Sequence, residues 1–306
     1  MIVVVAPGQG SQTPGFLAPW LDDESLRDQL GAISEVAGID LIKHGTVSDA
    51  DTIRDTAVAQ PLIVAAGLLT LNALTTGGRR EHISAVAGHS VGEITAAAAA
   101  GILSEDDAIR FVVERGSAMA SAAALEATGM SAVIGGDETV LLERLAELGL
   151  QPANFNGGGQ VVVAGALDAL AKLAEDPIKG TRVIPLQVAG AFHTRYMHPA
   201  VAHLETVAAA LTKNDPTLPI YTNRDGSLIE VGEHFVDLLV GQVSSPVRWD
   251  LTMNSLADAG VTGIIELAPA GALVGLAKRG LRGIPAVAVK TPEDLSAAFD
   301  LMEANA

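Results

Sequence analysis

A serine flanked by glycines constrains this chain more than any other feature. Residues 88–92 read GHSVG and fit the pattern G-x-S-x-G. In that pattern a strand turns sharply into a helix and exposes the serine hydroxyl, and the glycines leave room for the turn. Residues 83–87 predict the strand and residues 94–101 the helix. This order favours Ser90 as a nucleophile. The alternative is a small residue in a tight turn, because glycine supplies 32 of the 306 residues.

An arginine on an apolar helix face is the second feature. Ser104 is expected to cap a helix in which 3.6 residues per turn place Arg115 on one face with apolar residues. Those residues are Ala108, Phe111, Val112, Ala118, Met119 and Ala122. A buried guanidinium without an anion is costly, so Arg115 needs a carboxylate partner. Either an Asp or Glu of the chain itself or a bound ligand could supply this carboxylate. Arg110, near Asp106 and Asp107, is expected at the surface.

The N-terminal third predicts one strand followed by helices. Residues 2–6 form a continuous β-branched run and lead into a loop in which Gln9 lies between glycines. The N–H of Gln9 is a candidate oxyanion donor, although an ordinary strand exit fits equally well. Asp22 or Ser25 could cap a helix that runs to Ala37. Residues 49–54 form a short helical stretch. Pro61 is expected at the start of a buried helix over residues 62–74.

The middle of the chain predicts a separate small unit over residues 127–189. Strands are expected at residues 130–134, 159–165 and 182–186, and helices at 139–148 and 167–175. This alternation is typical of a ferredoxin-like α+β unit. Residues 154–158 read as a polar, glycine-rich loop, either lining a cleft or forming a simple turn.

The C-terminal part alternates strands and helices again. Strands are expected at 218–223, 264–267 and 286–289, and helices at 232–242, 246–259 and 271–279. The predicted fold class is therefore α/β. Residues 1–126 and 190–306 would form a large α/β-hydrolase-like catalytic domain with a mainly parallel sheet, and residues 127–189 an inserted ferredoxin-like subdomain.

His193 is the best general-base candidate among seven histidines, because it ends an apolar strand at a predicted domain boundary. His193 and His198 are five residues apart, and no pair has metal-binding spacing with a third ligand nearby. We therefore predict no metal site.

Composition narrows the function further. The absence of cysteine excludes disulfides and a cysteine nucleophile, and it suits a cytoplasmic protein. The formal net charge of −17 argues against binding nucleic acid. The longest apolar runs, near residues 64–71 and 96–103, fall short of the ~20 residues that span a bilayer, so no membrane segment is expected. Residues 1–6 are predicted to form a strand, so no signal sequence is expected.

The motifs together resemble those of malonyl-CoA:acyl carrier protein transacylases, a family that includes the acyltransferase domains of polyketide synthases. The resemblance extends over essentially the whole chain. Its motifs are PGQGSQ at 7–12, GHSVGE at 88–93, VVERGSAM at 112–119, NFNG at 154–157, GAFHT at 190–194, QVSSPVRW at 242–249 and GLAKR at 275–279.

This resemblance implies a ping-pong transfer of malonyl from malonyl-CoA to the phosphopantetheine thiol of acyl carrier protein, without a cofactor, for fatty-acid or polyketide synthesis. The intermediate would be an O-malonyl ester on Ser90. His193 would act as base, oriented by the main-chain carbonyl of Gln242 in place of the usual acid. The N–H groups of Gln9 and Val91 would form the oxyanion hole.

The resemblance also assigns the pocket. Arg115 would hold the free carboxylate of malonate by paired hydrogen bonds. Met119, Asn156 and Phe192 would line the pocket. The sequence Ala191-Phe192-His193 goes with malonyl in polyketide acyltransferases, because bulk at Phe192 disfavours a 2-methyl group.

Alternatives and partners complete the prediction. A serine esterase or thioesterase would use the same elbow, and transfer of methylmalonyl or another acyl group is a narrower alternative. A non-catalytic docking module is disfavoured by Ser90 and His193. The chain is expected to be a monomer. Coenzyme A and the carrier protein are anionic, so binding needs a local basic patch, and the alternative is scattered surface charge. The candidates are Arg195, Arg248, Lys278 and Arg279.

Overall fold

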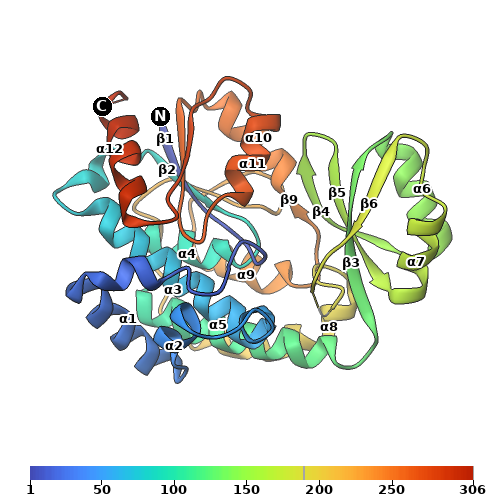
Figure 1. Ribbon diagram of the computed structural model, residues 1–306, viewed down its shortest axis with the longest axis horizontal. Coiled ribbons are helices and arrows are strands. Elements are labelled where there is room, and N and C mark those ends of the chain that lie inside the picture. The colour runs from blue at the N-terminus through green and yellow to red at the C-terminus, as the bar shows by residue number, and fades with distance from the viewer. Residues whose placement is uncertain (189, 306) are drawn as a thin grey trace.

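The computed structural model describes residues 1–188 and 190–305. Ala189, which ends the predicted inserted segment, and Ala306, which ends the second outer segment, lie outside the described residues. The chain forms a mixed α/β fold with one six-stranded and one five-stranded sheet. Figure 1 shows the two sheets in separate lobes, with both chain termini on the larger lobe, away from the smaller one.

The six-stranded sheet is parallel except at one edge, where β7 and β8 pair antiparallel. The predicted strand at residues 2–6 lies at its centre, and all of its residues are buried, as expected for a strand covered on both faces. In sheet order the strands are β11 (Ala286–Ala288), β10 (Gly263–Glu266), β1 (Ile2–Ala6), β2 (Ala85–Gly88), β7 (Ile220–Tyr221) and β8 (Leu228–Ile229).

Ten α-helices of the described residues belong to the larger lobe. Eight of them contribute to its main core, and α10 and α11 pack in a second apolar cluster with Val3 and Val5 of β1. The sequence analysis did not predict α2, α8 or α12. The helices are α1 (Glu24–Ala37), α2 (Leu41–Thr46), α3 (Thr56–Thr75), α4 (Gly92–Ala99), α5 (Glu105–Ala123), α8 (His198–Ala209), α9 (Gly232–Gln242), α10 (Trp249–Asp258), α11 (Ala272–Gly280) and α12 (Leu295–Glu303). Short 3-10 turns are η1 (Ala18–Asp22), η2 (Thr52–Arg54), η3 (Arg79–His82), η4 (Arg195–Met197) and η5 (Pro292–Asp294).

The helix α3 is the most buried long helix of this core. By length and composition alone it could cross a membrane, but 78% of its most apolar window is buried inside the protein. The prediction that Pro61 begins this helix is wrong. Asp55 caps the helix with a hydrogen bond from the N–H of Ala57, so the helix begins at Thr56 and Pro61 lies inside it. A good cap upstream outweighs the proline signal.

The five-stranded sheet forms the smaller lobe together with two helices. The order is β6-β3-β5-β4-β9; every pairing is antiparallel except that of β4 with β9. These elements confirm the strands and helices predicted within residues 127–189, except that β4 was missed. They are β3 (Thr128–Gly135), α6 (Glu138–Leu148), β4 (Gln151–Gly157), β5 (Gln160–Ala166), α7 (Leu167–Glu175), β6 (Thr181–Pro185) and β9 (Val247–Arg248).

The two faces of this sheet pack against different parts of the protein. In β5, Val161 and Val163 join the core formed with α6 and α7, whereas Val162 and Ala164 join the main core of the larger lobe. The period of two in a strand explains the alternation. Figure 1 shows α6 and α7 on the outer side of the sheet. The other side therefore faces the larger lobe.

Three further predictions need correction. Residues 154–158 are not a loop: β4 runs to Gly157, and only Gly158 and Gly159 form the turn to β5. The helix expected over 246–259 begins only at Trp249, after β9. The cap of α1 is neither Asp22 nor Ser25 but Asp23, whose carboxylate accepts hydrogen bonds from the N–H groups of Ser25 and Leu26.

Candidate active site

Ser90 lies at a sharp turn between β2 and α4. Its φ is 54°, in the left-handed region that a residue other than glycine seldom adopts. A Cβ on Gly88 would overlap the main chain at Gly92, and a Cβ on Gly92 would overlap the carbonyl of Ala6. Both glycines of the motif are therefore required by close backbone packing. The predicted strand, turn and helix are present in that order.

The peptide groups on both sides of Ser90 are held by side chains from distant segments. The N–H of Ser90 donates to Asn223 Oδ1 at 2.9 Å, and its carbonyl accepts from Gln242 Nε2 at 3.1 Å. These two bonds fix the strained turn from both sides. The side chain of Ser90 opens into a cavity of about 370 Å3 between the two lobes.

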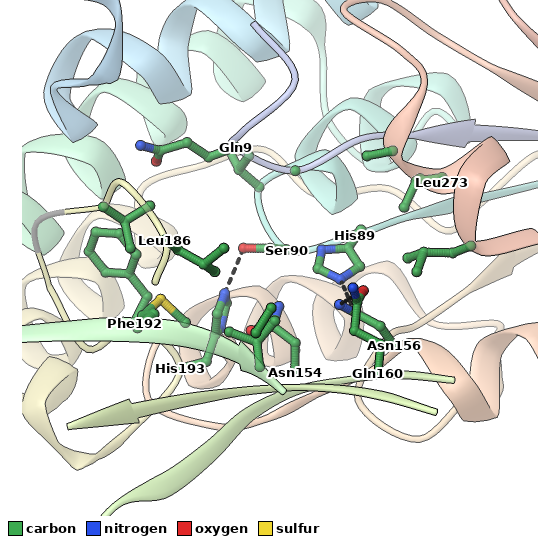
Figure 2. Close-up of a pocket in the computed structure, with 18 of the residues that line it drawn as sticks. Gln9, His89, Ser90, Asn154, Asn156, Gln160, Leu186, Phe192, His193 and Leu273 are labelled. Atoms are coloured by element: carbon green, nitrogen blue, oxygen red, sulfur yellow. Dashed lines mark hydrogen bonds between the residues drawn. The ribbon is translucent and has the colours of Figure 1, made fainter. Parts of the chain in front are cut away.

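His193 lies against the serine hydroxyl. Figure 2 shows its ring pointing at Ser90, and the distance from Nε2 to Ser90 Oγ is 2.7 Å. Its Nδ1 is 2.9 Å from the main-chain carbonyl of Gln242. A carbonyl only accepts, so Nδ1 carries the proton and Nε2 is left as the acceptor for the hydroxyl. Burial lowers the pKa of His193 to about 3, and the charge of Arg115 acts in the same direction. The imidazole is therefore a neutral base at neutral pH.

Arg115 projects from α5 to the same serine and is 1% exposed. One terminal nitrogen donates to Gln60 Oε1 at 2.6 Å, and the other donates to Gln242 Oε1 at 2.6 Å and lies 3.4 Å from Ser90 Oγ. Within the described residues, no carboxylate accepts a hydrogen bond from this guanidinium. Burial lowers the pKa of Arg115 to about 10, which still leaves it charged at neutral pH. The cation is thus available to an anionic ligand beside the serine. Arg110, in contrast, pairs with Asp106 and Asp107 at the surface, as predicted.

The N–H groups of Gln9 and Val91 belong to residues that line the cavity beside Ser90. In the part of the chain that the structure describes, neither N–H donates to a protein acceptor. The side chain of Gln9 is directed elsewhere, with Nε2 donating to the carbonyl of Arg54. Two free main-chain donors near a nucleophile are suited to stabilise an oxyanion.

The remaining predicted pocket residues line the same cavity. Met119, Asn156 and Phe192 are all lining residues. Asn156 Oδ1 lies 2.9 Å from His89 Nε2, and its Nδ2 donates to Gln160, as Figure 2 shows. Asn154 and Asn156 are two residues apart in β4, so both side chains lie on the face of the sheet that lines the cavity.

Four residues of the site were not identified from the sequence. Gln60 holds Arg115 and also donates to the sulfur of Met119. His89, Glu93 and Asn223 contact the elbow or its neighbours. His89 and Glu93 lie in the GHSVGE motif, which was a usable signal. Gln60 and Asn223 gave none, because only the fold brings them to Ser90.

The four basic candidates do not form one patch of free charges. Arg248 is paired with Asp250 at 2.7 Å and lies over the ring of Phe155. Arg195 lies over Tyr196. Lys278 and Arg279 lie in the last turn of α11, and Arg279 lines the cavity. Among residues 1–188 and 190–305 there is no cluster of three His, Cys, Asp or Glu side chains that could hold a metal ion.

The chain is similar to known proteins over nearly its whole length. The chain matches the acyl transferase domain family over residues 3–294. It is 52% identical over 299 residues to malonyl CoA-acyl carrier protein transacylase of Mycobacterium tuberculosis, covering 96% of this chain and 98% of that protein. The Escherichia coli K12 protein of the same name is 33% identical over 304 residues, covering 97% and 98%.

Solved structures give the same result. The crystal structure of MCAT from Mycobacterium tuberculosis superposes with a TM-score of 0.94 at 51% identity, covering 99% of both chains. A malonyl-transacylase solved in complex with its type II PKS acyl-carrier protein superposes with a TM-score of 0.91 at 31% identity, covering 98% of this chain and 99% of that one.

Proposed function

The chain belongs to the acyl transferase family, and from this premise we propose that it transfers malonyl from malonyl-CoA to the phosphopantetheine thiol of acyl carrier protein. The reaction would supply extender units for fatty-acid synthesis, and the same chemistry serves polyketide synthesis. The enzyme is an acyltransferase of the malonyltransferase type. The relatives named above carry that activity in their names.

The first half-reaction is acylation of the enzyme. Ser90 Oγ attacks the thioester carbonyl while His193 Nε2 takes the hydroxyl proton. The N–H groups of Gln9 and Val91 stabilise the oxyanion. The C–S bond then breaks, and the sulfur of coenzyme A leaves with the proton from His193. The product is an O-malonyl ester on Ser90.

The second half-reaction is the reverse with a different thiol. His193 removes the proton from the phosphopantetheine thiol of the carrier protein, and the sulfur attacks the ester carbonyl. Collapse of the tetrahedral intermediate returns the proton to Ser90 Oγ. Atoms and charge balance without a redox step, so we propose that no cofactor or metal takes part.

The observation that carries this proposal is the position of Arg115. Among the residues that the structure describes, the hydrogen-bond acceptors of this buried cation, Gln60, Gln242 and the nucleophile Ser90 at 3.4 Å, are all neutral. A malonyl carboxylate two carbons from the reacting carbonyl is an anion of the right reach, and the guanidinium fork suits its paired oxygens. A simple esterase substrate has no such group. We further propose that Phe192 narrows the pocket against a 2-methyl group.

The proposal also covers the domain organisation, oligomeric state, location and partners of the enzyme. The element order β3-α6-β4-β5-α7-β6 supports a ferredoxin-like subdomain over 127–189 within an α/β-hydrolase-like domain of residues 1–126 and 190–306. We propose a monomer that works in the cytoplasm and binds neither membranes nor nucleic acid. The burial of α3 supports its role as a core helix. The proposed contacts for anionic partners are Arg279, which lines the cavity, and its neighbour Lys278 in the last turn of α11.

The test is mass spectrometry of the intact protein after incubation with malonyl-, methylmalonyl- or acetyl-CoA. We expect a malonyl adduct on the wild type that is discharged by holo acyl carrier protein, and none on Ser90→Ala. Ser121→Ala, an exposed serine, is the matched control and should be loaded normally. Loading of Ser90→Ala at the wild-type level contradicts the assignment. Discharge by water as fast as by carrier protein would indicate a hydrolase.

A further inference from the structure

Glu93 is a buried carboxylate that the acyl-transfer steps do not use. It is the second residue of α4 and 1% exposed. Its Oε1 accepts from the N–H of Asn223 at 2.6 Å and from Thr222 Oγ1 at 3.0 Å. Its Oε2 accepts from Gln242 Nε2. The carboxylate thus connects the segment that follows β7 with the C-terminal end of α9.

Both residues that hold the peptide groups of Ser90 are anchored on this carboxylate. Asn223 accepts from the N–H of Ser90, and Gln242 donates to its carbonyl. Asn223 donates its own N–H to Glu93, and Gln242 donates its amide. Glu93 therefore fixes the two clamps of the strained turn without touching the serine hydroxyl.

The same carboxylate decides which end of the Gln242 amide meets Arg115. An amide has one accepting end and one donating end. Because Glu93 only accepts when ionised, it holds Nε2 on its own side, and Oε1 is left facing Arg115. If the amide turned over, its NH2 group would face the guanidinium, and Arg115 would lose one of its two close acceptors. Gln242 also orients His193 through its main-chain carbonyl.

Electrostatics favours the same arrangement. Burial raises the pKa of Glu93 to about 7, while its hydrogen bonds oppose the rise, so the group is partly ionised at neutral pH. Its negative charge raises the pKa of Arg115 against the effect of burial. One amide separates the two charges, so Glu93 balances the cation without occupying its carboxylate-binding side.

We infer that Glu93 is a positioning residue for carboxylate recognition: through Gln242 it holds Arg115 where an acyl group with a free carboxylate can reach it. This inference rests on the proposed function and extends it. A carboxylate placed directly on Arg115 would compete with the substrate. A carboxylate placed one amide away balances the charge and leaves the guanidinium free to bind.

The experiment measures Glu93→Gln with malonyl-CoA and acetyl-CoA side by side, using acyl-enzyme formation and holo acyl carrier protein as acceptor. The substitution keeps the shape but replaces one accepting oxygen by an NH2 group, which must face a donor, either the NH2 group of Gln242 or the N–H of Asn223. We expect kcat/KM for malonyl to fall about 10- to 100-fold, the range for a buried polar group left without its partner, mainly through KM. The change for acetyl should be several-fold smaller, because acetyl does not use Arg115.

The matched control is Glu266→Gln. Glu266 is a second fully buried glutamate, and it accepts from the N–H groups of Gly271, Leu273 and Val274 at the start of α11. Its replacement should lower Tm without changing the malonyl-to-acetyl ratio. If Glu93→Gln does not fold, Glu93→Asp replaces it. This variant keeps the charge but moves it away from Gln242, and the malonyl-to-acetyl ratio of kcat/KM is again the quantity compared.

Equal losses for malonyl and acetyl in the Glu93 variants would show a merely structural role and overturn the inference. Unchanged kinetics for both would overturn it as well. Failure of the proposed function is distinguishable, because then the wild-type protein itself would not be loaded by malonyl-CoA.

Discussion

The two walls of the cavity hold their residues by different means. On the wall of the larger lobe, Ser90, Arg115 and His193 are fixed by hydrogen bonds of 2.6 to 3.1 Å to Gln60, Asn223 and Gln242. On the wall of the smaller lobe most lining side chains are apolar, and packing sets their positions. They include Met130, Ala132, Val162 and Leu186, with Asn154, Asn156 and Gln160 as the polar exceptions.

We infer from this difference that the wall of the larger lobe carries out the reaction and that the wall of the smaller lobe sets the shape of the pocket. Hydrogen bonds fix atoms within narrow distances and angles, and in a dry site the loss of one partner leaves an unpaired group. Apolar contacts tolerate small changes in volume at lower cost. Substitutions in the first wall should therefore change rates by orders of magnitude, and those in the second wall should mainly change which acyl group fits.

The largest effect is expected for His193→Ala. Without the base that accepts the Ser90 proton, acylation by malonyl-CoA should fall about 10²- to 10⁴-fold, measured by rapid-quench mass spectrometry. His198→Ala, an exposed histidine five residues away, is the control and should stay near the wild-type rate. A loss of less than tenfold in His193→Ala would show that another group takes the proton.

The next effect is expected for Arg115→Ala. Malonyl transfer should fall roughly 10²- to 10³-fold, because the substrate carboxylate would be left without its cation in a dry site. Acetyl transfer should be retained or rise. Arg110→Ala, on the same helix but in surface ion pairs, should change neither. Equal losses of malonyl and acetyl transfer would mean that Arg115 only supports the structure.

A smaller effect is expected for the apolar residues that shape the pocket, Phe192 of the larger lobe and Leu186 of the smaller one. Phe192→Ala removes the bulk proposed to exclude a 2-methyl group. The ratio of methylmalonyl to malonyl loading should rise roughly 10-fold, since a pocket discriminates by about that much per methyl group. Leu186→Ala, a lining residue 36% exposed, should move the ratio less. A ratio unchanged by Phe192→Ala would place the size filter elsewhere.

The smallest effect is expected for pH. The lowered pKa of His193, about 3, means that its neutral form persists well below pH 6.5, the ordinary range of histidine. In the wild type, protonation of Glu93, whose pKa is about 7, should lower the acylation rate as the pH falls from about 8 to 5. In Glu93→Gln this group is absent, and the low pKa of His193 predicts no break near pH 6.5. A break near 6.5 that persists in this variant would contradict the low pKa of His193.

Much of the fold could be predicted where the signal is local. The β-branched run at residues 2–6 predicts a doubly covered strand, and β1 is the centre of the larger sheet. The period of 3.6 residues placed Arg115 on the buried face of α5, where the structure has it. The errors also have local causes. Asparagines and glycines at 154–158 suggested a loop, but pairing with β5 makes residues 154–157 part of a strand, and only Gly158 belongs to the turn.

The sequence alone determined the elbow, because its strand, glycines and helix are consecutive and each acts on its neighbours. It also determined the family, and with it the acyltransferase chemistry. Only the tertiary structure decided which neutral and acidic groups surround the arginine. Gln60, Glu93, Asn223 and Gln242 come from four segments, and hydrogen bonds between such distant segments leave no periodic trace in a single sequence.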